Sequence, residues 1–196
     1  MKHPDDALRA RLDAFRDLLL TWNQRINLIA PADAAQIGQR HIADSLQLLP
    51  LLPAAGAMGD LGSGAGLPAL VLAAAEPGRE WHLVESDRRK CAFLIEAART
   101  LGLAATRIHA ARIEEATLPP LSGLTARALA PLAKLLPHAA RLLAPDGVAI
   151  FPKGRNAELE LTEAMPGWTM QVERHPSRTD AAATILRLSE IRRAAT

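Results

Sequence analysis

The sequence has little of what stabilises secreted proteins or anchors membrane proteins. Its 196 residues contain one cysteine, Cys91, so no disulfide can form within the chain and a zinc site of four cysteine ligands is excluded. No apolar run approaches the ~20 residues of a membrane-spanning helix, and the charged N-terminus has no apolar signal core. We therefore expect a cytoplasmic monomer that uses no metal and contacts no membrane.

Aromatic side chains and net charge are also scarce. Three tryptophans, three phenylalanines and no tyrosine provide no stacking platform of the kind that binds single-stranded nucleic acid. The formal net charge of +2 permits contact with phosphate without requiring it. In contrast, 49% of the residues are hydrophobic and only 22% are charged, which predicts a packed core rather than a disordered chain.

Hydrophobic periodicity separates a helical N-terminal part from a part with alternating elements. Apolar residues recur at helical spacing over 4–22, and a second helix is expected from a cap at Asp33, with Gln36 three residues on, to about residue 49. From residue 54 onward, strands alternate with helices. The expected strands are 57–61, 81–85, 106–109, 124–129, 147–151, 168–173 and 184–188, and the expected helices are 67–75, 88–101, 131–143 and 155–165.

This alternation predicts an α/β fold with a doubly wound, mostly parallel sheet of seven strands. The last two strands are joined by a short loop without a helix, so we expect them to pair as an antiparallel hairpin at the end of the sheet. The chain is expected to have two parts, an N-terminal helical extension over 1–53 that packs on the core and an α/β domain over 54–196.

The strongest local pattern is the turn after the first expected strand, GDLGSGAGLP over 59–68. Gly62, Gly64 and Gly66 let the backbone turn tightly and approach a ligand closely. Glu85 ends the next strand, and an acid about 20 residues after such a turn can accept hydrogen bonds from both ribose hydroxyls of a nucleoside cofactor. A plain strand–helix turn or a solvated glutamate would explain either feature alone. Their combination favours a bound nucleoside.

The glycine spacing distinguishes two nucleoside cofactors. The dinucleotide fingerprint Gly-x-Gly-x-x-Gly would need a glycine at position 67, where the chain has Leu67. S-adenosylmethionine has no pyrophosphate but carries a cationic sulfonium, and Asp60 is suitably placed beside that charge. The pattern therefore favours S-adenosylmethionine, with a nicotinamide-dependent oxidoreductase as the alternative. The helix-free final hairpin is also more typical of methyltransferases than of dehydrogenases.

Several separated motifs match one family. They are LTWN at 20–23 with NL at 27–28, RHIADSL at 40–46, DLGSGAGLP at 60–68, ESDRRKCAFL at 85–94, RIE at 112–114, ARA at 126–128 and KGR at 153–155. In these the chain resembles the bacterial 16S ribosomal RNA guanine-N7 methyltransferases, also called the glucose-inhibited division protein B family. The glycine loop is common to many methyltransferases, whereas WNxxxNL together with RHxxDSL is specific. Ala69 and Gly123 depart from residues that are frequent in the family.

The resemblance implies a Rossmann-like methyltransferase domain over 54–196 and roles for specific residues. The residues expected to bind S-adenosylmethionine are Asp60, Gly62, Gly64, Gly66, Leu67, Glu85, Ser86, Asp87, Ile113, Glu114 and Arg127. The residues expected to act on the target base are Arg127, Arg40 and Asp44. The residues expected to contact RNA are Arg40, His41, Arg88, Arg89, Lys153 and Arg155. For Arg40, His41, Asp44 and Ser45, a salt-bridge network that docks their helix is the alternative to a place in the RNA pocket.

The implied reaction agrees with what the sequence lacks. Guanine N7 has an in-plane lone pair and no proton, so its methylation needs no general base, and the protein chiefly aligns the reactants. ARALAP at 126–131 contains no Asn-Pro-Pro-Tyr-like tetrad of the amino-group methyltransferases. The implied partner is 16S ribosomal RNA, within the small ribosomal subunit or its precursor. A methyltransferase of the same fold with another substrate and a non-catalytic RNA-binding module remain alternatives.

Overall fold

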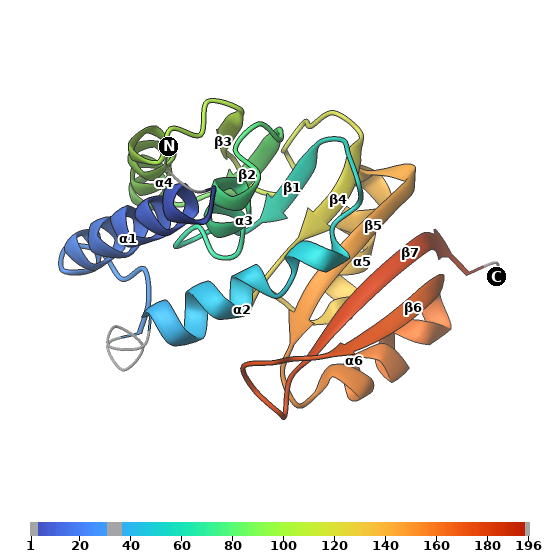
Figure 1. The fold of residues 1–196 in the computed structure, drawn as a ribbon. Coiled ribbons are helices and arrows are strands. Elements are labelled where there is room, and N and C mark those ends of the chain that lie inside the picture. Colours follow the sequence, from blue (N-terminus) through green and yellow to red (C-terminus); the bar gives the residue numbers. More distant parts are fainter. Residues whose placement is uncertain (1–3, 31–36, 195–196) are drawn as a thin grey trace.

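One seven-stranded sheet organises the protein. The computed structural model describes residues 4–30 and 37–194, and its strands lie in the order β3-β2-β1-β4-β5-β7-β6 (Figure 1). The strands are β1 (Met58–Leu61), β2 (Trp81–Glu85), β3 (Thr106–Ala110), β4 (Leu121–Thr125), β5 (Leu143–Lys153), β6 (Trp168–Pro176) and β7 (Thr184–Arg193). β1 to β5 are parallel, and β7 pairs antiparallel with both β5 and β6. The doubly wound sheet and its terminal hairpin are as the sequence predicts.

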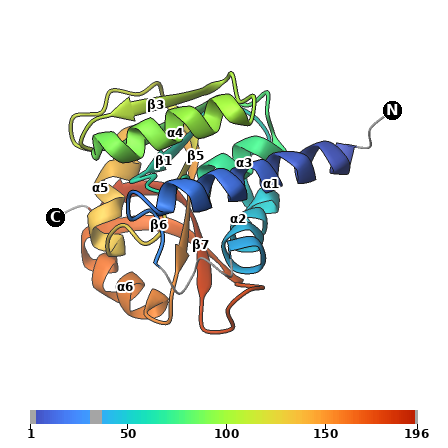
Figure 2. The same cartoon turned by 90° about the vertical axis from the view of Figure 1, so that its left-hand side faces the viewer.

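Helices cover both faces of this sheet. They are α1 (Pro4–Asn23), α2 (Ala43–Leu46), α3 (Ala69–Ala75), α4 (Arg88–Thr100), α5 (Leu132–Leu142) and α6 (Ala157–Ala164), with a π-helix η2 (Ile37–Ile42) leading into α2 and 3-10 turns η3 (Leu49–Leu51) and η4 (Met165–Gly167). α1 lies against α3 and α4 on one face (Figure 2), and α5 lies against α6 on the other. Within the described residues, no helix has the length and apolar character needed to cross a membrane.

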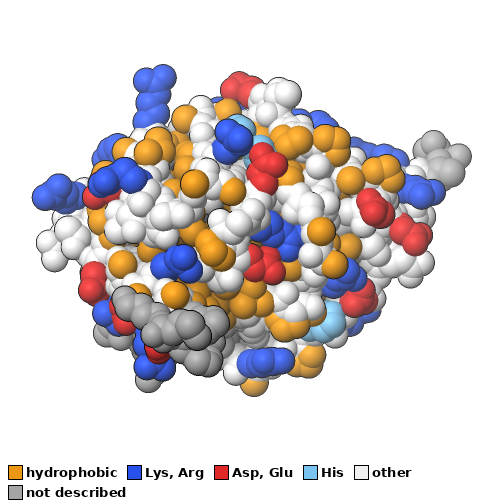
Figure 3. Space-filling model, turned by 45° about the horizontal axis from the view of Figure 1, so that its top comes forward, with side chains coloured by type: hydrophobic (Ala, Val, Ile, Leu, Met, Phe, Trp, Pro, Cys, Tyr) orange, Lys and Arg blue, Asp and Glu red, His pale blue; other side chains and the backbone are white. Residues whose placement is uncertain are grey.

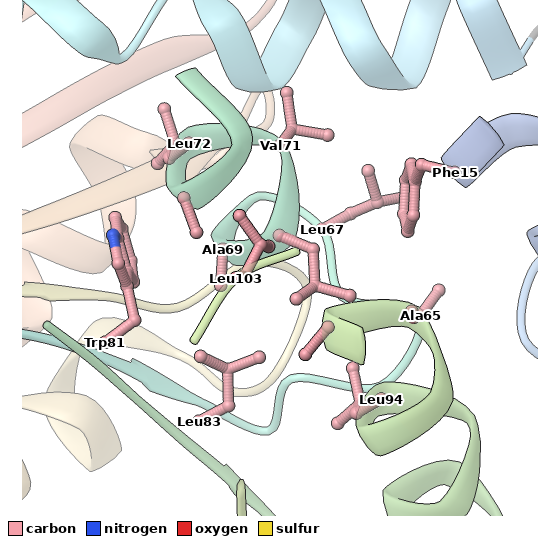
Figure 4. Close-up of a cluster of buried hydrophobic side chains, with 14 of the residues drawn as sticks. Phe15, Ala65, Leu67, Ala69, Val71, Leu72, Trp81, Leu83, Leu94 and Leu103 are labelled. Carbon is pink, nitrogen blue, oxygen red and sulfur yellow. The ribbon is translucent and has the colours of Figure 1, made fainter. Parts of the chain in front are cut away.

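Apolar side chains are buried on both faces, because a parallel sheet is covered on both sides. On one face, Leu83 of β2 and Leu94 of α4 pack in the same cluster as Leu67 and Phe15 (Figure 4). On the other face, Phe151 of β5 packs with the apolar sides of α5 and α6. Successive side chains of β5 point alternately into the two clusters, with Ile150 in the first and Phe151 in the second. This fixes the register of β5, because a shift by one residue would turn each side chain to the opposite face of the sheet.

The N-terminal extension shares the first of these clusters. Phe15 and Leu19 of α1 are fully buried in it. The Phe93 ring of α4 lies 6.4 Å from that of Phe15 and 5.9 Å, edge-on, from that of Trp22. The extension therefore packs directly on the α/β part, while the predicted boundary near residue 53 remains a prediction.

Several element boundaries differ from the prediction, and β5 for example begins at Leu143 instead of 147. The fourth strand is Leu121–Thr125 and not 124–129, because the chain turns after Thr125 and Ala128 has a left-handed φ of +52°. The run of apolar residues after 125 belongs to a turn in which Ala126 is buried and Ala128 and Leu129 are exposed, and local pattern does not distinguish such an apolar turn from a strand. The helix predicted over 67–75 begins at Ala69. The predicted cap at 33–36 lies outside the described residues, and the following segment is π-helical over Ile37–Ile42 before α2.

The sheet topology determines where a ligand can bind. β1 lies between β2 and β4, so the strand order reverses there, and the connections from β1 and β4 leave on opposite sides. In open α/β sheets, ligands bind in the crevice beyond the carboxyl ends of the strands at such a reversal. Glu85, the glycine turn after β1 and the segment after β4 all lie at this edge.

Candidate functional site

The turn after β1 has three glycines with left-handed backbone. Gly62, Gly64 and Gly66 have φ of +63°, +50° and +75°, a region that costs a residue with a Cβ roughly 1–2 kcal/mol. A Cβ at Gly62 would also lie 2.5 Å from Leu129 Cδ1. The turn therefore depends on glycine for its conformation and, at Gly62, for its close contact with the segment after β4.

Glu85 joins the end of β2 to this turn. Its Oε2 accepts a hydrogen bond from the Gly64 backbone N–H at 2.9 Å, and its Oε1 accepts one from the Asp87 N–H at 2.8 Å. The residue is only 8% exposed. The structure thus brings together the acid and the glycine turn that the sequence pattern pairs. Cys91 is buried nearby and donates from Sγ to the Glu85 carbonyl, and burial raises the pKa of its thiol.

A cavity of about 400 Å³, the first cavity, opens beside the turn. It brings together Gly62, Gly64, Glu85, Ser86, Ile113, Glu114 and Arg127, all predicted from the sequence to bind the cofactor. The remaining lining residues, not assigned to the cofactor from the sequence, are Val84, Lys90, Ala111, Arg112, Ala128 and Leu129. Its size falls in the range of small-molecule sites, which is roughly 300–1,000 Å³.

Other residues predicted to bind the cofactor do not line this cavity. Asp87 caps α4, and its Oδ1 accepts from the backbone N–H groups of Arg89 and Lys90 at 2.8 and 3.3 Å, which lowers the Asp87 pKa. Gly66 and Leu67 are buried, the latter in the core below the turn. The direct contact of these three residues with a cofactor remains a prediction. In the structure Gly66 shapes the turn before α3, Leu67 packs in the core and Asp87 caps α4.

Asp60 is a buried acid under the site. Its Oδ1 accepts from Thr125 Oγ1 at 2.6 Å, whereas Oδ2 is buried and has no hydrogen-bond partner among the described residues. Burial raises the Asp60 pKa to about 7, against the lowering effects of hydrogen bonds from Thr125 and Ser63 and of the nearby Arg127 charge. A buried carboxylate oxygen without a donor is suited to a cationic ligand.

A second cavity, of about 300 Å³, adjoins the first. Both cavities are lined by Arg127 and Ala128, in the segment after β4. The second cavity is also lined by Arg40, Asp44, Pro152, Lys153, Gly154, Ser177, Ala183, Thr184 and Ile185. Its walls therefore come from the N-terminal extension, the end of β5 and the connection between β6 and β7, which are far apart in the sequence.

Arg127 stands between the two cavities and is held by the N-terminal extension. Its Nη1 lies 3.4 Å from Asp44 Oδ2 and 3.2 Å from His41 Nδ1. A guanidinium can only donate, so His41 Nδ1 is the acceptor and the imidazole proton is on Nε2. The Ser45 hydroxyl donates to the His41 carbonyl at 2.7 Å. The RHIADSL segment thus makes docking contacts and also places Arg40 and Asp44 in the cavity wall.

The basic residues predicted to contact RNA lie in different environments. Lys153 is 9% exposed, and its Nζ donates to Glu160 Oε2 and to the Ala130 carbonyl, both at 2.8 Å. Its charge is therefore neutralised and supports the segment after β4, which argues against the predicted phosphate contact. The residues that remain exposed are Arg40, Arg88, Arg89 and Arg155. On the face in Figure 3, basic and acidic side chains are interspersed.

Sequence comparison links the chain to named proteins. The family described as "GidB: rRNA small subunit methyltransferase G" matches residues 9–185. The chain is 57% identical over 187 residues to ribosomal RNA small subunit methyltransferase G of Acidiphilium cryptum, with 94% of this chain and 86% of that protein covered. It is 54% identical over 184 residues to the protein of the same name from Granulibacter bethesdensis, with 93% and 85% covered.

Solved structures of other methyltransferases share the fold. The ribosomal protein L11 methylase of Lactobacillus delbrueckii subsp. bulgaricus has a TM-score of 0.61 at 15% identity, over 74% of this chain and 75% of that one. TYW2 of M. jannaschii, solved with AdoMet, has a TM-score of 0.60 at 13% identity, over 80% and 77%. These likenesses confirm the Rossmann-like methyltransferase fold, and the family match favours a methyltransferase over a nicotinamide-dependent oxidoreductase. The chain belongs to the GidB family, the rRNA small subunit methyltransferases G.

Proposed function

We propose that this protein transfers a methyl group from S-adenosylmethionine to N7 of a guanine in 16S ribosomal RNA. The observation that carries the proposal is that two cavities meet at Arg127 and Ala128, at the carboxyl edge of the sheet. Methyl transfer needs its reacting atoms about 3–3.5 Å apart, in line and shielded from water. Adjoining cavities with a shared wall meet that requirement for a cofactor and a nucleobase.

The first cavity suits S-adenosylmethionine in its chemistry. The Glu85 carboxylate keeps lone pairs for ribose hydroxyls, because each oxygen already accepts only one hydrogen bond from the backbone. Ile113 offers an apolar side chain for adenine. Asp60 does not line the cavity, but its buried Oδ2, which has no donor among the described residues, would act on the sulfonium charge from beneath the glycine turn. When bound, S-adenosylmethionine supplies an electrophilic methyl carbon on a sulfonium sulfur. The residues of the cavity bind it, orient it and exclude water.

The second cavity suits a guanine. Arginine commonly donates to the O6 and N7 edge of this base. Because N7 must stay free to accept the methyl group, Arg127 would donate to O6 next to it, or Arg40 would do so from the rim. Asp44 and His41 keep the Arg127 guanidinium in place. Methylation at N7 leaves a positive charge on the base, and the Asp44 carboxylate in the cavity wall would stabilise that charge.

The test separates binding of the cofactor from transfer to the base. Small-subunit RNA from cells that lack this protein is incubated with purified protein and labelled S-adenosylmethionine, and the product is mapped by mass spectrometry. We expect N7-methylguanosine at one site, formed about 100-fold more slowly by Arg127→Ala, with S-adenosylmethionine affinity changed only a few-fold. Absence of transfer to RNA, or methylation of another atom, would overturn the proposal. An equal loss of cofactor affinity in Arg127→Ala would remove its role at the base.

The proposed partner and location follow from the substrate. The 16S RNA is a part of the small ribosomal subunit, so the protein would act on that subunit or its precursor in the bacterial cytoplasm. The scarcity of aromatic residues favours a folded RNA target over a single-stranded one. If the target is the assembled particle, transfer to protein-free RNA should be slow, and transfer to particles should be fast.

A further inference from the structure

The connection between β6 and β7 is hydrogen-bonded to the N-terminal extension, mainly by residues that do not line either cavity. Thr184, the first residue of β7, pairs with Lys153 at the end of β5. The preceding loop, residues 177–183, therefore lies at the same edge of the sheet as the two cavities. Figures 1 and 2 show this loop reaching toward α2. Ser177 and Ala183 from the loop line the second cavity, so its position sets the shape of that cavity.

Gln47, directly after α2, holds this loop through its side-chain amide. Its Nε2 lies 3.2 Å from Ser177 Oγ and 3.3 Å from Thr179 Oγ1. Its Oε1 accepts a hydrogen bond from the Arg178 backbone N–H at 2.8 Å. The Gln47 amide thus contacts three successive residues of the loop. In these contacts both its N–H donors and its oxygen acceptor have partners.

The same contacts extend to Asp44 and from there to Arg127. Asp44 Oδ1 accepts from Gln47 Nε2 at 2.5 Å and from Thr179 Oγ1 at 2.8 Å, and its Oδ2 lies 3.4 Å from Arg127 Nη1. The Asp44 and Arg127 side chains are only 24% and 18% exposed. With one oxygen fixed by Gln47 and Thr179, the carboxylate presents the other to Arg127 in a defined direction.

We infer that Gln47 and Thr179 are positioning residues for the target base, and this inference rests on the proposed function. Neither residue lines the second cavity. They act by holding the loop as a wall of that cavity and by orienting Asp44, which in turn orients Arg127. Transfer rates are sensitive to such placement, since a 1 Å misplacement can cost on the order of 100-fold. The first cavity shares none of these contacts except through Arg127.

If Gln47 and Thr179 served only to stabilise the fold, their removal would lower the free energy of unfolding, whereas a positioning role predicts an effect on methyl transfer. The loop is largely exposed, and hydrogen bonds of exposed side chains contribute little to stability. Removing the Gln47 amide should therefore leave the free energy of unfolding and the cofactor affinity almost unchanged. Its effect should appear in transfer to RNA.

The experiment compares Gln47→Ala with Gln171→Ala, a matched control whose exposed glutamine lies on β6 outside these contacts. For Gln47→Ala we expect kcat/KM for the small-subunit substrate to fall on the order of 10-fold. The Kd for S-adenosylmethionine should change by less than about twofold and Tm by no more than about 4 °C, equivalent to roughly 1 kcal/mol. Gln171→Ala should match the unmodified protein in all three measurements.

A second pair of variants isolates the hydroxyl contact. Thr179→Val keeps the shape of the side chain without the hydroxyl and should transfer methyl groups several-fold more slowly, whereas Thr179→Ser should retain the rate. Wild-type transfer by Gln47→Ala, equal rates for the two Thr179 variants, or a parallel loss of cofactor affinity would each overturn the inference. If the unmodified protein itself forms no N7-methylguanosine, the proposed function fails first, and the two failures are thereby distinguished.

Discussion

Asp60 should make binding of S-adenosylmethionine depend on pH. Its buried carboxyl has a pKa of about 7, so below neutral pH it is mostly protonated in the free protein. The groups that face it are Thr125, Ser63 and Arg127, which lower this pKa, and Glu85, which raises it. A cation bound in the first cavity favours the ionised form, so binding releases a proton and the affinity rises with pH.

The size of the effect follows from the titration of this one group. With a pKa of about 7, roughly one tenth of the Asp60 carboxyls are ionised at pH 6 and roughly nine tenths at pH 8. If the complex holds Asp60 ionised, affinity should rise about tenfold over that range, equivalent to about 1.4 kcal/mol. The contribution of Asp60 to the free energy of unfolding changes with pH in the opposite direction to the cofactor affinity. Because the folded pKa is raised above 3.8, the contribution of Asp60 is fully present below that value and is lost as pH rises through 7.

Isothermal titration calorimetry in two buffers of different protonation enthalpy measures both the affinity and the proton release. The Asp60→Asn variant keeps the shape of the side chain and cannot ionise, so its affinity should change with pH only through the amino group of the ligand. S-adenosylhomocysteine lacks the sulfonium charge and should show a weaker dependence in the unmodified protein. If Asp60→Asn and the unmodified protein give the same pH profile, the reasoning is refuted.

Three further variants test the architecture of the site. Gly62→Ala places a Cβ 2.5 Å from Leu129 Cδ1 in a left-handed backbone, and urea unfolding should show a loss of about 1–3 kcal/mol; an unchanged midpoint would contradict the close contact. Lys153→Met removes the cation beside Glu160, which keeps only its hydrogen bond from the Leu132 N–H, and should lower the free energy of unfolding by roughly 3 kcal/mol, measured by thermal unfolding, with partial recovery on adding Glu160→Gln. Glu85→Ala should weaken S-adenosylmethionine about 10–100-fold in calorimetry, and unaltered affinity would exclude Glu85 as the ribose acceptor.

Local sequence pattern was enough to predict the sheet and one wall of the site. Strand and helix periods alternate from residue 54 onward, and that alternation predicts βαβ units with a mostly parallel sheet, as the structure has. The glycine turn and Glu85 are each close to a strand end, so their meeting follows from parallel pairing of β1 with β2. Such predictions succeed because each depends on neighbours in sequence or on one simple rule of topology.

The features that the sequence does not predict include side-chain contacts between residues far apart in the chain. Gln47 and Thr179 are separated by 132 positions, and nothing in either local sequence indicates their hydrogen bond. The ion pair of Lys153 with Glu160 on the next helix, and the burial of Lys153, cannot be read from charge alone, so the sequence does not reveal that Lys153 already has a partner. The predicted end of β4 is four residues too late because the turn that follows has the same apolar composition as a strand, although Ala128 and Leu129 in it are exposed.

The hydrogen bond between Asp44 and Thr179 joins residues 135 positions apart, so the second cavity can be completed only late in the synthesis of the chain. Asp44 leaves the ribosome early, together with the extension that carries it. The wall opposite Asp44 exists only after β7 has emerged and paired with β5. A nascent or shortened chain that stops before β7 would already contain the glycine turn and Glu85, yet it would have no enclosed place for a nucleobase.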